Sequence, residues 1–127
     1  MTAERLFLLF GGVNMFLAVA LGAFGAHGLK HRLTSEMLAV FNTAVEYHFY
    51  HALGLLLVGT VCARFEASNS LKASGWCMLL GMLLFSGSLY ALSLTGVKGF
   101  GAITPVGGLC FLASWVLFVS AIWRQGI

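Results

Sequence analysis

The sequence predicts an all-α fold, an up-down bundle of four transmembrane helices with a short interfacial amphipathic helix between the first and the second. Composition is the first observation behind this prediction. Of the 127 residues, 60% are hydrophobic and only 9% are charged, and the mean hydropathy is +0.95. Because a soluble domain carries about 25% charged residues, this chain has too few charges to cover a soluble surface. Its length fits one domain over residues 1–127.

The second observation is the length of the uncharged stretches. Asp, Glu, Lys and Arg are absent from residues 6–29, 47–63, 73–97 and 99–123. A helix needs about 20 residues to cross about 30 Å of hydrocarbon. The second stretch is shorter, but Glu46 and Arg64 at its ends can extend their side chains to the membrane surface. We therefore predict transmembrane helices over residues 6–26, 46–64, 73–95 and 104–123.

The first helix is expected to be retained. Arg5 and the small residues of GAFGA (22–26) resemble parts of a secretory signal. The apolar region of a signal spans about 7–15 residues. The uncharged stretch that follows Arg5 is longer, which favours a retained helix over a cleaved signal.

The connection over residues 28–47 is long and carries its own helical pattern. Apolar residues recur at Leu33, Met37, Val40, Phe41, Ala44 and Val45, close to helical spacing. Thr34 or Ser35 can cap the start. We predict a short amphipathic helix over residues 34–45 at the membrane interface. Thr43 and Glu46 match a capping box, which predicts a break near Asn42; one continuous helix over residues 34–64 is the alternative.

The other connections are short, which predicts antiparallel neighbours. ARFEASNSLK (63–72) is a polar turn in which Asn69 or Ser70 can cap the third helix, and GVKGFG (96–101) is glycine-rich. Thr104 followed by Pro105 predicts an N-cap and a first helical residue.

The distribution of basic residues predicts the orientation. Four lie on the side of the termini, Arg5, Arg64, Lys72 and Arg124, and three on the other side, Lys30, Arg32 and Lys98. The positive-inside rule then places both termini in the cytoplasm. Because the basic residues are dispersed, no nucleic-acid partner is expected.

Small and polar residues inside the apolar stretches predict close helix packing. Small residues recur every four positions at Ala18, Gly22 and Ala26, and at Gly87, Ala91 and Thr95. Such stripes serve either packing within the bundle or a dimer face. Asn14, Ser86, Ser88 and Ser93 are expected to form hydrogen bonds between helices. Cys62, Cys77 and Cys110 form no CxxC pair, so they are expected to be free thiols.

The stretch EYHFYH (46–51) is the candidate polar cluster: Glu46, Tyr47, His48 and His51, with His27 as a further donor. His48 and His51 share a helix face and, with His27 or His31, could ligate a metal. Two histidines three residues apart on one helix are poorly placed to serve as axial ligands of a haem, which usually come from different helices. The favoured interpretation is an interfacial belt in which Tyr47, Tyr50 and His48 keep wet polar tips. His51, one turn deeper, is then expected to form a hydrogen bond to a neighbouring helix, and no metal or cofactor is predicted.

Four motifs resemble one family of small membrane proteins. They are GAFGAHGLK (22–30), AVEYHFYHALGLL (44–56), LFSGSLYALSLTG (84–96) and ITPVGG (103–108), followed by Trp115. The family is domain of unknown function 423, which includes YgdD-like bacterial inner-membrane proteins and animal proteins like transmembrane protein 256. Its motif positions fall on His27, Tyr47, His51, Ser86, Gly87, Tyr90, Thr104, Pro105 and Gly107. The family pattern accepts Gln at the position of His48, which argues against a metal pair of His48 with His51. The resemblance implies a multi-pass protein, in the inner membrane for a bacterial source, and no activity.

The residues favour a non-enzymatic function. No nucleophile–base pair or paired carboxylates can be assembled, and no charged residue lies near the centre of an uncharged stretch. We expect an accessory protein or a bundle that interacts with lipid or protein, with the lipid bilayer, a homo-oligomer or a larger membrane complex as partners. The alternatives are a small oligomeric transporter or channel, and metal or haem binding through His51.

Overall fold

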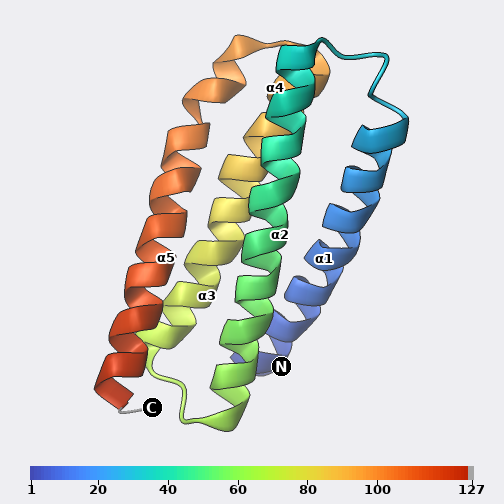
Figure 1. Cartoon of the computed structure of the whole chain (residues 1–127). Coiled ribbons are helices and arrows are strands. Elements are labelled where there is room, and N and C mark those ends of the chain that lie inside the picture. Colours follow the sequence, from blue (N-terminus) through green and yellow to red (C-terminus); the bar gives the residue numbers. More distant parts are fainter. Residues whose placement is uncertain (126–127) are drawn as a thin grey trace.

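The computed structural model describes residues 1–125 and is all-helical (Figure 1). The elements are α1 (Ala3–His27), α2 (Ser35–Arg64), α3 (Asn69–Gly81), the π-helical turn η1 (Met82–Ser86), α4 (Gly87–Thr95), the 3-10 turn η2 (Lys98–Ala102) and α5 (Thr104–Gln125). Since α3, η1 and α4 follow one axis, the elements of residues 1–125 form four helical rods, each antiparallel to the next, and α1 begins at the end where α5 finishes (Figure 1). The prediction of an all-helical fold is confirmed.

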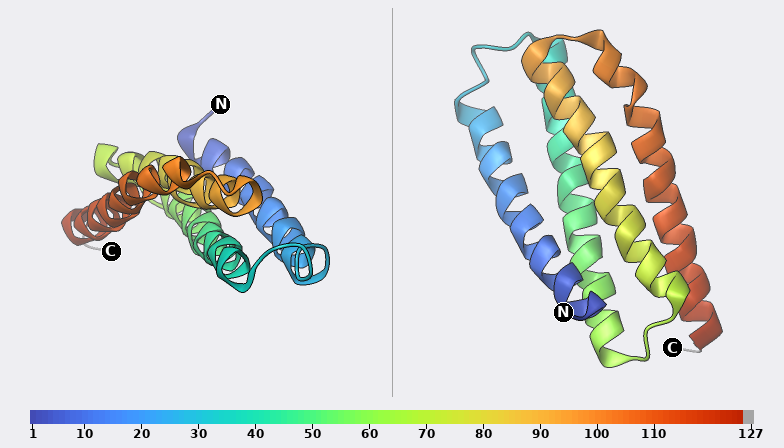
Figure 2. Two further views of the ribbon diagram at one scale, coloured as in Figure 1. Left: turned by 90° about the horizontal axis from the view of Figure 1, so that it is seen from above. Right: turned by 180° about the vertical axis from the view of Figure 1, so that it is seen from behind.

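The rods are arranged around α2. Helix α1 packs mainly on α2, α2 packs on α3 and α4, and α5 packs on α3 and η1 (Figure 2). Within residues 1–125, three helical segments are long and apolar enough to cross a membrane: Ala3–His27, Asn69–Thr95 and Lys98–Gln125. Helix α2, which carries the polar cluster, is not among them. The central position of α2 is what brings its histidines into contact with helices on both sides.

Helix α2 is continuous over 30 residues, so it extends about 45 Å. The predicted separate helix over residues 34–45 and the break near Asn42 are therefore wrong, and the alternative of one helix is correct. The hydroxyl of Thr43 donates to the carbonyl of Ala39 within the helix (3.0 Å) and caps nothing. Phe41 and Ala44 are fully buried against neighbouring helices, and this packing keeps the segment helical.

The helix ends confirm one predicted cap and correct two. Thr34 caps α2 by accepting from the backbone N–H of Met37 (3.1 Å). Ser68, rather than Asn69 or Ser70, caps α3 by accepting from Leu71 N–H (3.1 Å). Thr104 is the first residue of α5, and its hydroxyl lies 2.6 Å from Ser88 Oγ on α4. Thr104 thus links two helices, where the sequence predicted an N-cap.

The π-helical turn η1 lies where α2, α4 and α5 meet. A side chain at Gly107 would collide with the backbone of Phe85, because α5 passes directly against this turn. Ser86 donates to the carbonyl of Ala44 on α2 (2.8 Å). Turns of this kind are frequent at functional sites, and this one fixes the wall of a groove described below.

The apolar core lies nearer the end where α1 begins. It is formed by buried side chains of α1, α2, α3, η1 and α5, among them Phe7, Leu55, Leu71 and Met78. Gly75 leaves the space that the ring of Phe7 occupies. The core therefore joins all four rods, and Phe111 carries it up to the ring of His51.

Candidate functional site

Two buried histidines on α2 form the polar centre of the bundle. His48 and His51 are each 5% exposed. They lie three residues apart, so they share one side of the helix but meet different neighbours. His48 faces α1 and α4, and His51 faces α5.

Both ring nitrogens of His51 are occupied. Nδ1 lies 2.8 Å from the carbonyl oxygen of Tyr47; because a carbonyl only accepts, Nδ1 carries the hydrogen. Trp115 Nε1–H then donates to Nε2 (3.0 Å). The ring also stacks on Phe111 with centroids 3.5 Å apart and planes at 7°. His51 is therefore the neutral Nδ1–H tautomer, with no nitrogen lone pair free for a metal or for proton abstraction.

His48 forms the middle of a hydrogen-bond chain. Asn14 donates through Nδ2 to the carbonyl of Phe10 (2.8 Å), which turns its Oδ1 toward His48. His48 Nε2 donates to this oxygen (2.9 Å). Nδ1 then accepts from the hydroxyl of Tyr90 (2.9 Å). The chain joins α4, α2 and α1 through three side chains, and we name it the Asn14–His48–Tyr90 chain.

The structure divides the predicted polar cluster. His48 and His51 are buried in separate networks, whereas Glu46 and His27 are exposed. Tyr47 lies beside His51, with rings nearly parallel and centroids 6.3 Å apart. The prediction that His48 keeps a wet polar tip is wrong, because α1 and α4 cover it. The prediction that His51 forms a hydrogen bond to a neighbouring helix is confirmed by Trp115.

The sequence pattern does not identify the partners of the histidines. It predicts a hydrogen bond between helices for Asn14 without naming His48, and it marks Tyr90 and Trp115 only as parts of family motifs. The partners lie 34, 42 and 64 residues from the histidines. A polar residue within an apolar stretch signals a buried bond, but its partner depends on how the helices are rotated.

Two grooves adjoin the histidines. The α2–α5 groove is a cavity of about 470 Å³ lined by Tyr47, His51, Phe85, Pro105, Gly108, Leu109, Phe111, Leu112 and Trp115. The α1–α4 groove is a cavity of about 350 Å³ lined by Asn14, Leu17, Leu21, His48, Leu79, Met82, Leu83, Gly87 and Tyr90. Both are mainly apolar with a few polar groups, which is the usual character of small-ligand sites.

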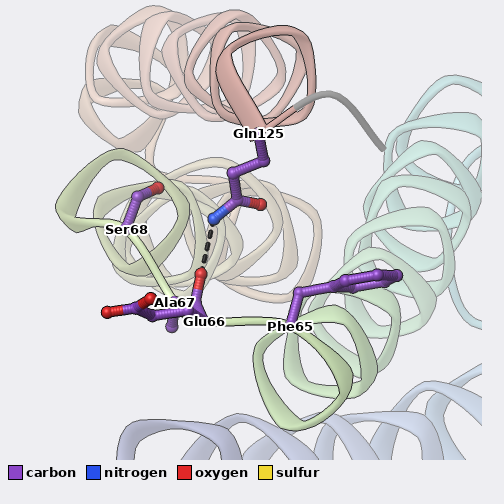
Figure 3. A pocket seen from close by; sticks show the side chains of 5 residues that line it. All are labelled: Phe65, Glu66, Ala67, Ser68 and Gln125. Atoms are coloured by element: carbon purple, nitrogen blue, oxygen red, sulfur yellow. Dashed lines mark hydrogen bonds between the residues drawn. The ribbon is translucent and has the colours of Figure 1, made fainter.

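A third cavity, of about 420 Å³, lies at the turn between α2 and α3 (Figure 3). Its walls are Phe65, Glu66, Ala67, Ser68 and Gln125. Gln125 donates through Nε2 to the carbonyl of Glu66, which ties the last turn of α5 to this loop. The cavity is remote from both histidines. Within residues 1–125, no group of three or more His, Cys, Asp or Glu side chains is arranged to hold a metal.

Long apolar helices joined by buried polar contacts define this chain as a helical membrane protein. The family described as "Protein of unknown function (DUF423)" matches residues 21–108, and the chain belongs to it. The chain is 47% identical to the UPF0382 membrane protein YwdK of Bacillus subtilis (strain 168), over 92% of this chain and 95% of that protein.

Staphylococcal relatives are also named as membrane proteins. The chain is 42% identical to the UPF0382 membrane protein SSP2132 of Staphylococcus saprophyticus, over 94% of this chain and 98% of that protein. It is 40% identical to the UPF0382 membrane protein SH2409 of Staphylococcus haemolyticus, over 94% and 97%. These names identify membrane proteins and state no reaction. No solved structure matches the chain.

Proposed function

We propose that this protein is a four-span integral protein of the plasma (inner) membrane that acts without catalysis, by holding a lipid acyl chain in the α2–α5 groove. The observation that carries the proposal is the groove itself, a cavity of about 470 Å³ walled by aromatic and aliphatic side chains. This volume lies within the range of known ligand sites, about 300–1,000 Å³.

The fourth span is α2. Its length of about 45 Å exceeds the roughly 30 Å of hydrocarbon. It lies antiparallel between α1 and the rod formed by α3, η1 and α4, both of which are long and apolar enough to cross. A helix packed along two spanning neighbours crosses with them, and His48 then lies between α1 and α4, away from the surrounding lipid.

The lining of the α2–α5 groove favours an uncharged tail over a charged ligand. None of its nine residues is Asp, Glu, Lys or Arg. Both ring nitrogens of His51 form hydrogen bonds, to Tyr47 and Trp115. A ligand in the groove would therefore contact His51 only through its aromatic ring. Since the lining holds no nucleophile next to a free base, it supports binding rather than a reaction.

Filling the groove tests the proposal. A Cβ at Gly108, which lines the groove, would meet only the ring of Phe85, at 3.8 Å, so Gly108→Leu is the variant chosen to occupy the cavity. Gly12→Leu is the matched control, because Gly12 faces open space on α1. We expect native mass spectrometry to detect a retained phospholipid on the wild type and on Gly12→Leu, and not on Gly108→Leu. Equal retention by all three proteins would refute the proposal.

A further inference from the structure

The α1–α4 groove differs from the α2–α5 groove because a side-chain amide, that of Asn14, lines it. Asn14, His48 and Tyr90 belong to its wall together with six apolar or small residues. Buried polar groups inside a membrane protein are expensive to maintain and commonly mark functional sites. The question is which kind of molecule would need these groups in this groove.

The polar groups lie at mid-depth. Asn14 is eleven residues from the start of α1 at Ala3 and thirteen from its end at His27. If α1 spans the bilayer, Asn14 lies within about 2 Å of the middle of its helix. His48 and Tyr90 reach the same level through the hydrogen-bond chain. The groove therefore presents polar atoms where a bilayer offers no water.

The hydrogen-bonding capacity of the chain is not exhausted. Within residues 1–125, Asn14 Nδ2 uses one hydrogen, toward the carbonyl of Phe10. An amide nitrogen carries two hydrogens, so one remains. Tyr90 donates its hydrogen to His48 and keeps oxygen lone pairs. A donor left unpaired in hydrocarbon is costly, and an acceptor atom in the groove would satisfy it.

The groove also has room for a ring. A Cβ at Gly87 would meet no heavy atom closer than the carbonyl oxygen of Met82, at 3.9 Å. Helices α1 and α4 do not pack on each other there; α2 separates them and forms the floor. Leu17 and Leu21 of α1 and Leu83 of η1 also line this cavity of about 350 Å³.

We propose that the α1–α4 groove binds the ring of an isoprenoid quinone, with Asn14 Nδ2 donating to a ring carbonyl. The depth selects this class of ligand. Carbonyls of glycerophospholipids lie near the headgroups, about 15 Å from the midplane of a 30 Å hydrocarbon layer. An uncharged quinone carries its carbonyls on an apolar molecule that can itself enter the hydrocarbon. The inference shares the membrane placement of the proposed function and is independent of the α2–α5 groove.

The experiment uses the full-length protein in nanodiscs of quinone-free phosphatidylcholine, titrated with a short-tailed isoprenoid quinone. Bound quinone is measured by native mass spectrometry. Gly87→Phe fills the groove and leaves the hydrogen-bond chain intact, and Gly12→Phe is its control on an open face of α1. We expect wild type and Gly12→Phe to bind alike and Gly87→Phe to lose binding.

A second variant tests the hydrogen bond. Asn14→Leu removes the donor and should weaken quinone binding about fivefold. The competing probe is an isoprenoid hydrocarbon of the same tail length without carbonyls, which should bind far more weakly than the quinone. Equal binding of the two probes, or unchanged quinone binding by Gly87→Phe, would overturn the inference. Gly108→Leu should bind quinone normally, so this result is separable from failure of the lipid proposal.

Discussion

At the scale of single residues, the two histidines differ in whether their hydrogen bonds can accommodate a second ring proton. His51 Nε2 faces the N–H of Trp115, so a second proton on the ring would place two donors against each other. His48 Nδ1 faces a hydroxyl, which can rotate and accept instead of donate. Protonation would thus break the network of His51 but leave that of His48 connected.

Removing the donor to His51 should destabilise the protein. Trp115→Phe keeps an aromatic ring beside Phe118 but leaves His51 Nε2 without a partner. We expect a loss of about 1–2 kcal/mol in the free energy of unfolding, because a buried acceptor is left unsatisfied. Unfolding by SDS titration in detergent measures it. Trp123→Phe is the control, because Trp123 is 86% exposed; equal losses for the two variants would contradict the assigned bond.

At the scale of elements, α2 and the turn η1 determine what the histidines meet. The sequence pattern near Asn42 is typical of a helix start. The helix nevertheless runs through this point, because Phe41 and Ala44 are buried against neighbouring helices. Ser86 of η1 then bonds to α2, and Ser88 of α4 bonds to Thr104 of α5. These contacts hold α5 beside α2 although the two backbones are not adjacent.

Enlarging Gly107 should separate α5 from η1. Gly107→Ala places a methyl group against the backbone of Phe85, which cannot move as a side chain does. We expect a loss of about 1–3 kcal/mol, the usual cost of overpacking, measured by the same SDS titration. Gly12→Ala should be neutral or slightly stabilising, since it adds a better helix former in open space. A neutral Gly107→Ala would show that the two backbones are not in contact.

At the scale of the whole molecule, the basic residues lie towards the two ends of the bundle. By the helix bounds, Arg5, Arg64, Lys72 and Arg124 lie near one end, and Lys30, Arg32 and Lys98 lie near the other. The positive-inside rule therefore favours the first end in the cytoplasm, by one charge. So small a difference makes the orientation sensitive to a single residue.

Reporter fusions test the orientation. Alkaline phosphatase fused after residue 127 should be inactive, because the C-terminus is expected in the cytoplasm, whereas a fusion in the loop at Lys30 should be active. Fluorescence of a green fluorescent protein fused at the C-terminus is the complementary control. Phosphatase activity at the C-terminus would reverse the proposed orientation.

Parts of the site could be predicted from sequence and parts could not. His51 was expected one turn inside the membrane with a partner on another helix, because its spacing from Tyr47 gives its depth. His48 was placed at the surface, because its position beside Glu46 and Tyr47 suggested an interfacial belt. Local pattern does not reveal that α1 and α4 cover this side of α2.

Composition and uncharged length alone predict the all-helical membrane class and the approximate extent of α1, α3–α4 and α5. The length of an uncharged stretch and the turn residues at its ends are local properties of the sequence. Because the hydrocarbon thickness sets how many residues a spanning helix needs, these properties are enough to predict the helices. Three features become visible only in the folded chain. They are the continuity of α2, the π-helical turn η1, and the separate partners and groove of each histidine. Those features depend on how helices distant in sequence are rotated and packed. Burial and hydrogen bonding stabilise particular pairs of residues, and the average hydropathy of a segment does not identify those pairs.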